Sequence, residues 1–265
     1  MSHLRYFLRT IYASFVKELK IFMRYPYWLI VSLVSPFLWV TMFMLFGAAF
    51  ASSEEFVGFI TIGMIGLLLA DISLWGIGLG LRREQMRGTL LSLYATPASR
   101  VAVLLGSAME NFFELAVSST IILGYASLAF NFTTFITDPI AVFLVVFFTI
   151  FALLGFGLLF AAVTMVVKEP NAIINIVQPI LFIFAGIFFP ISVLPPNARI
   201  ISELIPLTYA VTAMRKVFVY GYTTSMILKD VGVLTVFGIV LNTLGILALR
   251  YIERRALKKG SLGKF

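Results

Sequence analysis

The chain has 265 residues, of which 61% are hydrophobic and only 12% are charged, and its formal net charge is +8. Soluble domains carry roughly 25% charged residues, so this composition is typical of a protein embedded in lipid. The sequence has no cysteine and one histidine, which excludes disulfides, thiolate metal sites and multi-histidine metal sites.

An amphipathic helix is predicted at 4–25. Apolar residues recur there at helical spacing on one face, and the opposite face carries the basic residues Arg5, Arg9, Lys17, Lys20 and Arg24. Such a helix is expected to lie along the inner membrane surface. Two interpretations stay open: an anchor that only orients the first span, or a lever that touches a cytoplasmic partner.

Six long apolar runs follow this helix, and each is close to the ~20 residues that cross a ~30 Å hydrocarbon core. The sequence therefore predicts an all-α integral membrane protein, a single domain over 1–265. Six transmembrane helices are expected at about 27–50, 57–81, 101–130, 139–167, 171–191 and 230–250. The apolar segment 195–220 is broken by prolines, which predicts short re-entrant helices between spans five and six.

The basic residues predict the orientation of the spans. Six spans place both chain ends on one side, which then receives most of the lysines and arginines. The other side receives only Arg199, Arg215, Lys216 and Lys229. We therefore expect a multi-pass protein of the cell (plasma) membrane with cytoplasmic termini. The positive charge is explained by topology and by contact with anionic lipid, so no nucleic acid partner is expected.

Three acidic residues, Asp71, Glu110 and Glu114, lie inside the predicted spans. Asp71 is roughly 15 Å from the cytoplasmic end of its span, Glu114 is expected at a similar depth, and Glu110 lies one turn away on the same helix face. Charged groups in the membrane interior are costly and often functional. One interpretation is a cation or proton site, and the other is hydrogen bonding to neighbouring helices.

A charged segment separates the second and third spans and ends in "MRGTLLSLYATPASR". The pattern predicts a short helix at 88–97, bounded by Gly88 and Pro97 and carrying an apolar face of leucines. The alternative is a helix that rests on the membrane surface. The chain has no phosphate-binding loop or catalytic pattern, so any ATP must be bound by another chain.

Two segments resemble the permease family of ABC type-2 transporters, in particular its drug-resistance-like exporters. The first is "GTLLSLYATPASR", in which the matching residues are Gly88, Thr89, Leu90, Leu93, Thr96, Pro97, Ser99 and Arg100. The second is "GIFFPISVLPPNARIISELIPLTYAVTAMR", with Phe189, Pro190, Leu194, Pro195, Pro206, Leu207, Thr208, Tyr209 and Arg215. Leu91 departs from the pattern, since the family often has glutamate there.

The resemblance implies the transmembrane permease subunit of an ATP-driven ABC exporter, working as a homodimer or a heterodimer. Two ATP-binding cassette subunits would bind ATP and Mg, while this chain would be no enzyme and would hold no cofactor or metal. The segment 88–97 would be the coupling helix and 4–25 the connecting helix. The residues expected to couple to the ATPase are Lys17, Glu18, Gly88, Thr89, Leu90, Leu93, Tyr94, Thr96 and Pro97.

In this family, spans one, two and five tend to line the transport path, which makes Phe37, Met42, Phe46, Ile180 and Phe184 candidates for the lining, with lipid contact as the alternative. The substrate is expected to be lipophilic, drug-like, lipid-linked or ionic. The competing function is a stand-alone ion- or proton-coupled secondary transporter that uses the intramembrane acids. It predicts internal repeats, and the sequence shows none.

Overall fold

The computed structural model describes residues 3–48, 54–96, 98–134 and 136–259, which form helices joined by turns. In chain order the helices are α1 (His3–Arg24), α2 (Pro26–Ala48), α3 (Glu54–Asp71), the π-helix η1 (Ile72–Ile77), α4 (Gly80–Met86), α5 (Leu90–Tyr94), α6 (Arg100–Phe130), α7 (Pro139–Thr164), α8 (Pro170–Phe184), the 3₁₀ turn η2 (Ile191–Val193), α9 (Pro196–Glu203), α10 (Pro206–Phe218) and α11 (Thr224–Lys259). The all-α prediction is confirmed.

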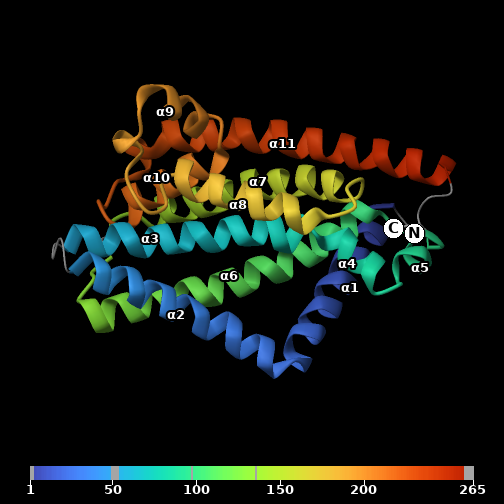
Figure 1. Ribbon diagram of the computed structural model, residues 1–265, viewed down its shortest axis with the longest axis horizontal. Helices are drawn as coiled ribbons and strands as arrows, with labels where there is room; N and C mark the ends of the chain where they lie inside the picture. The colour runs from blue at the N-terminus through green and yellow to red at the C-terminus, as the bar shows by residue number, and fades with distance from the viewer. Residues whose placement is uncertain (1–2, 49–53, 97, 135, 260–265) are drawn as a thin grey trace.

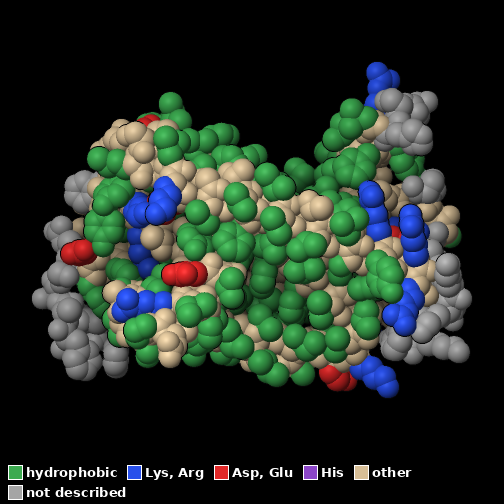
Figure 2. Space-filling model, turned by 90° about the horizontal axis from the view of Figure 1, so that it is seen from above, with side chains coloured by type: hydrophobic (Ala, Val, Ile, Leu, Met, Phe, Trp, Pro, Cys, Tyr) green, Lys and Arg blue, Asp and Glu red, His purple; other side chains and the backbone are tan. Residues whose placement is uncertain are grey.

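The helices are arranged between two opposite ends of the molecule (Figure 1). The start of α1, the end of α11, and α4 and α5 lie at one end. The other end holds α9, α10 and the start of α3. Figure 2 shows hydrophobic side chains over the middle of one face, with lysines and arginines gathered toward both ends. This distribution suits a bilayer, whose apolar core excludes charge.

Within the described residues, four helical segments are long and apolar enough to cross a membrane, which makes this a multi-pass membrane protein. They are Glu55–Ile77, Arg100–Phe130, Pro139–Thr164 and Thr224–Arg255. The first and fifth predicted spans correspond to shorter apolar helical segments, Val34–Leu45 and Pro170–Phe184. The topology of six spans therefore stays a prediction.

The second predicted span, 57–81, is not one uninterrupted α-helix. It changes from α3 into the π-helix η1 after Asp71 and then continues into α4. A π-helix inserts a residue into the regular ladder, and such segments frequently mark functional sites.

Local sequence signals set the start of α7. Asp138 precedes the helix and its Oδ1 accepts hydrogen bonds from the backbone N–H groups of Ile140 (3.0 Å) and Ala141 (3.4 Å). Pro139 occupies the first turn, where a backbone N–H has no partner within the helix, so the N–H group that proline lacks is not needed. α7 then packs along α11, where the Asn242 side chain donates to the Phe151 carbonyl oxygen (2.8 Å).

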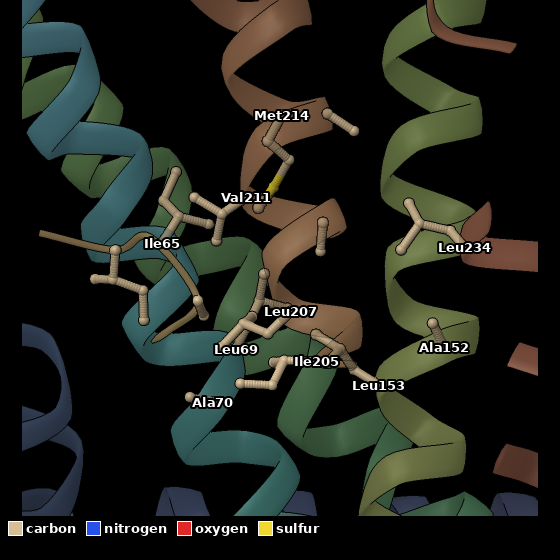
Figure 3. Close-up of a cluster of buried hydrophobic side chains, with 14 of the residues drawn as sticks. Ile65, Leu69, Ala70, Ala152, Leu153, Ile205, Leu207, Val211, Met214 and Leu234 are labelled. Carbon is tan, nitrogen blue, oxygen red and sulfur yellow. The ribbon is translucent and has the colours of Figure 1, made fainter. Parts of the chain in front are cut away.

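The largest core cluster joins α3, α7, α10 and α11. Figure 3 shows its side chains meeting between these helices: Ile65 and Leu69 from α3, Ala152 and Leu153 from α7, Leu207, Val211 and Met214 from α10, and Leu234 from α11. The two short helices predicted within 195–220 are thus present as α9 and α10. Helix α10 is buried on several sides rather than exposed as a loop.

Candidate functional site

A tight turn leads from α4 into α5. Gly88 has a φ of +72°, a left-handed conformation that glycine adopts without strain, and nothing lies within 4 Å of the position that a Cβ would occupy there. The conformation rather than a close contact therefore favours glycine. The Thr89 hydroxyl donates to the Glu84 carboxylate (Oε2, 2.6 Å) and backbone carbonyl (3.1 Å). These bonds fix the start of α5 against α4.

The leucines of α5 do not all face outward. Leu90 is only 4% exposed and packs into a cluster with Leu81, Leu104 and Leu158, and Leu93 packs partly buried against the same cluster. Ser92, Ala95 and Thr96 are exposed instead. Leu90 therefore attaches α5 to the membrane helices, while Ser92 and the two residues just after α5 form an exposed face. Pro97 and the side chain of Tyr94 lie outside the described residues.

Ion pairs join α1 to α4. Lys17 Nζ contacts Glu84 and lies 3.0 Å from Glu18 Oε1, while Arg87 Nη1 lies 3.3 Å from Glu18 Oε1 and 3.7 Å from Glu84 Oε1. The carboxylates are mostly buried and the cations half-exposed. The predicted coupling residues Lys17 and Glu18 are thus brought next to the segment that carries α5.

The ionisation of Glu84 strengthens this link at neutral pH. Burial alone would raise the pKa of Glu84, but hydrogen bonds from Lys17 and Thr89 outweigh it and hold the pKa below its ordinary value of 4.5. The stabilisation from the ionised carboxylate is therefore present above pH 4.5 and is lost as the pH falls through the lowered pKa.

Helix α1 also packs closely on α6. A Cβ at Gly106 would lie 2.4 Å from the Ile11 carbonyl oxygen and 2.5 Å from the Ser14 Cβ, so only glycine allows this approach. α1, α4, α5 and the start of α6 therefore form one connected unit, which we call the end unit (residues 3–24 and 80–108).

A cavity of about 760 Å³ adjoins the end unit and is bounded by α1, α2, α3, η1, α4 and α6. The three predicted intramembrane acids, Asp71, Glu110 and Glu114, all line it. Asp71 accepts a hydrogen bond from Gln178 Nε2 (2.5 Å), whose Oε1 in turn accepts from Trp75 Nε1 (3.2 Å). The acids thus share one space, with a glutamine of α8 as a partner.

The candidate pathway residues have different surroundings. The Phe37 ring meets Tyr125 of α6 edge-on at 5.1 Å, and Phe184 packs against the main core. Met42 and Ile180 are exposed on α2 and α8. The side chain of Phe46 lies outside the described residues. The structure therefore leaves Met42 and Ile180 accessible, whereas Phe37 and Phe184 contribute to packing.

Comparison with family models matches residues 9–219 to the ABC-2 type transporter model. The chain belongs to the ABC-2 type transporter family. A search of curated proteins found no match. The match runs from within α1 through α10, so it includes most of the end unit and every acid of the cavity. The ABC-2 membrane domain is a non-catalytic transmembrane subunit of an ABC transporter, and the ATPase lies in a partner subunit.

Two features of this ABC-2 subunit were not predicted from the sequence. Gln178 is the partner of Asp71, and the signal that could have found it is a polar amide within an apolar run. Arg83 belongs to the basic residues that indicate orientation, and in the structure it also lines the cavity and donates to the Gly76 carbonyl oxygen (2.7 Å).

Among the described residues no three acidic or histidine side chains gather closely enough to hold a metal ion.

Proposed function

We propose that the chain is the permease subunit of an ATP-driven ABC exporter. Two ATP-binding cassette subunits, which hold the ATP and Mg, would dock on the cytoplasmic end of the molecule against α5. One observation carries the proposal: Ser92 of α5 and, directly after the helix, Ala95 and Thr96 are exposed, while the start of α5 is bonded through Thr89 and Glu84 to Lys17 of α1. A force applied to α5 would therefore reach α1 directly.

The end unit supplies the path for this force. Displacement of α5 would pull on Glu84 through Thr89, on α1 through Lys17, and on α6 through the contact at Gly106. The cavity borders α1, α4 and α6, so relative movement of these helices would change its shape. In this scheme ATP binding in the partner alters the chamber that holds the substrate.

A second permease subunit, identical or similar, completes the proposed exporter. Helices α2 and α8 expose apolar side chains such as Met42 (49% exposed) and Ile180 (41% exposed). In the proposed dimer these helices face the partner permease and the transport path between them.

The docking of α5 is tested by placing charges on its outer face. We expect Ser92→Arg combined with Thr96→Asp to abolish co-purification of a co-expressed ATP-binding cassette subunit while the permease remains folded. Thr133→Arg, an exposed substitution beyond α6, should leave co-purification intact. Full retention of the cassette subunit and of its transport-coupled ATPase activity by the α5 variant would reject the docking role. Leu90→Asp is a poor test because Leu90 is buried in the permease itself.

The alternative function is a stand-alone ion- or proton-coupled transporter, which the acids of the cavity keep open. The family match favours the exporter, since its ATPase lies in a partner. Transport by the reconstituted permease without ATP, stopped by Asp71→Asn with Glu114→Gln, would favour the alternative. Strict dependence on ATP and the cassette subunits would exclude it.

A further inference from the structure

The cavity beside the end unit combines an acidic interior with an aromatic wall. Carboxylates from three helices line it: Glu18 of α1, Asp71 of α3, and Glu110 and Glu114 of α6. Aromatic and aliphatic residues make up much of the rest, among them Phe22, Tyr25, Tyr27, Trp75, Leu68 and Leu115. A volume of about 760 Å³ falls within the range of pockets that bind drug-sized molecules.

The charge balance of the lining is opposite to that of the whole chain. Four carboxylates face two guanidinium groups, Arg83 and Arg87, in a protein whose net charge is +8. Arg87 is engaged by Glu18 and Glu84, and Arg83 donates to the Gly76 carbonyl oxygen. The two arginines therefore lie at the α4 end of the cavity, while Asp71 lines it from α3 and Glu110 and Glu114 line it from α6.

Glu110 is the most informative of these acids. It is only 8% exposed and lines the cavity, and no hydrogen bond or ion pair to its carboxylate occurs within the part of the chain that the structure describes. Arg83 of the same lining attracts this carboxylate through space but forms no salt bridge with it. A buried carboxylate with no hydrogen-bond partner is costly in a membrane helix, where such groups usually mark a ligand or ion path. The side chain is therefore in place for a positive group that enters the cavity.

The backbone around the cavity is also specialised. Asp71 ends α3, and the π-helix η1 begins directly after it and carries Trp75 and Gly76 along the same wall. Asn111 of α6 packs where a Cβ at Gly76 would lie, 2.6 Å from its Oδ1. An irregular helix at an acidic cavity is a second, independent sign of a functional site.

We propose that this cavity binds a lipophilic organic cation, with Glu110 as its counter-charge and the aromatic wall covering its apolar body. Aromatic rings attract organic cations through their π faces as well as by burying apolar area. The cavity is far larger than a bare metal ion, and the described acids do not converge into a metal cluster. The proposal rests on the exporter function, which it deepens by naming the substrate class.

Binding of tetraphenylphosphonium to the purified permease in nanodiscs tests the site without any ATPase subunit. Tetraphenylborate, an anion of the same shape, is the matched probe, and binding to empty nanodiscs is subtracted. We expect saturable binding of the cation only, weakened about tenfold by Glu110→Gln, as expected for loss of a buried charge partner. Glu110→Asp should restore much of the affinity, and Glu203→Gln, an exposed acid of α9, should change nothing.

Equal saturable binding of cation and anion, or undiminished cation binding by folded Glu110→Gln, would overturn the proposal. The exporter function is judged separately, by ATP-driven movement of tetraphenylphosphonium in vesicles that also contain cassette subunits. Cation binding without ATP-driven movement upholds the site and contradicts export of this class. ATPase coupling with no cation binding contradicts the site alone.

Discussion

At the scale of single residues, Arg215 shows how a charge is accommodated in the apolar core. Its guanidinium donates to the carbonyl oxygens of Gly186 (2.6 Å), Ile187 (2.8 Å) and Phe59 (3.2 Å), and lies 3.4 Å from the Phe59 ring centroid. The side chain thereby ties α10 to α3 and to the turn after α8. The three carbonyl dipoles and the aromatic face of Phe59 together stabilise the buried guanidinium.

Replacing Arg215 by methionine should lower the free energy of unfolding by about 3 kcal/mol, because buried carbonyl groups lose their donors. Arg199→Met is the matched control. Arg199 also donates to carbonyl oxygens, of Leu194 and Ser192, but it is exposed, so its loss should cost about 0.5 kcal/mol or less. Denaturant titration in detergent measures both values. Equal losses of stability would contradict the role of Arg215 as a buried donor to these carbonyl groups.

The sequence could identify the polar residues of the site more readily than their partners. Asp71, Glu110 and Glu114 stand out because acids are rare in apolar runs, and the structure places all three on one cavity. The partner Gln178 lies on α8, and nothing local to α3 indicates that α8 is its neighbour. Likewise, the apolar face of α5 predicts that the helix packs against some partner. It does not indicate that Leu90 packs against the membrane helices of the same chain.

At the scale of elements, the contact between α1 and α6 decides whether the end unit moves as one body. The helices meet where Gly106 lies against Ile11 and Ser14, and the ion pairs of Lys17 and Arg87 lie one to two turns further along α1. Membrane helices usually associate by close backbone approach through small residues. The reason is that the hydrophobic effect does not drive association within lipid, so van der Waals packing must do so.

Gly106→Ala should push α1 away from α6 and destabilise the protein by roughly 1–3 kcal/mol, the usual cost of overpacking. Gly124→Ala on the same helix is the control, since its Cβ would meet nothing within 4 Å and alanine favours helix by about 1 kcal/mol. Thermal unfolding gives the stabilities, and ATPase activity with the cassette subunit should become uncoupled only in Gly106→Ala. Unchanged stability and coupling in that variant would refute the α1–α6 contact.

The elements themselves followed from the sequence where a periodic pattern or a proline marked them. The amphipathic pattern at 4–25 corresponds to α1, and the prolines of 195–220 correspond to the starts of α9 and α10. The π-helix η1 had no such signal, because an inserted residue leaves an all-apolar run looking uniform. The early end of α8 at Phe184 was also missed, since the apolar run continues through the turn that contains Gly186 (φ +73°).

At the scale of the whole molecule, the two ends differ in what they hold. The end unit carries the ion-paired α1 and α4 with α5, whereas the opposite end carries α9 together with α10, which packs on α3 (Figure 1). The basic residues predict that the end unit faces the cytoplasm. The number of crossings between the two ends then depends on the shorter apolar helices.

Helix α8 is the decisive case. It has 15 residues, or roughly 22 Å of helix, against a ~30 Å hydrocarbon core. If α8 and the turn after it cross the membrane, the loop before α7 and the start of α9 lie on the same side. If α8 does not cross, α9 lies on the side of α5, which disagrees with its place at the opposite end of the molecule (Figure 1).

Single cysteines separate these cases cleanly, because the natural sequence contains no cysteine. We expect an impermeant maleimide to label Thr133→Cys and Asn197→Cys in intact cells, and to label Ser92→Cys and Arg254→Cys only after the membrane is permeabilised. All four positions are exposed in the structure, so protection reports the membrane and not the fold. If Asn197→Cys, like Ser92→Cys, is labelled only after permeabilisation, α8 is not a span. Helices α9 and α10 would then lie on the side of the ATPase, where they could not serve as the outer end of an export path.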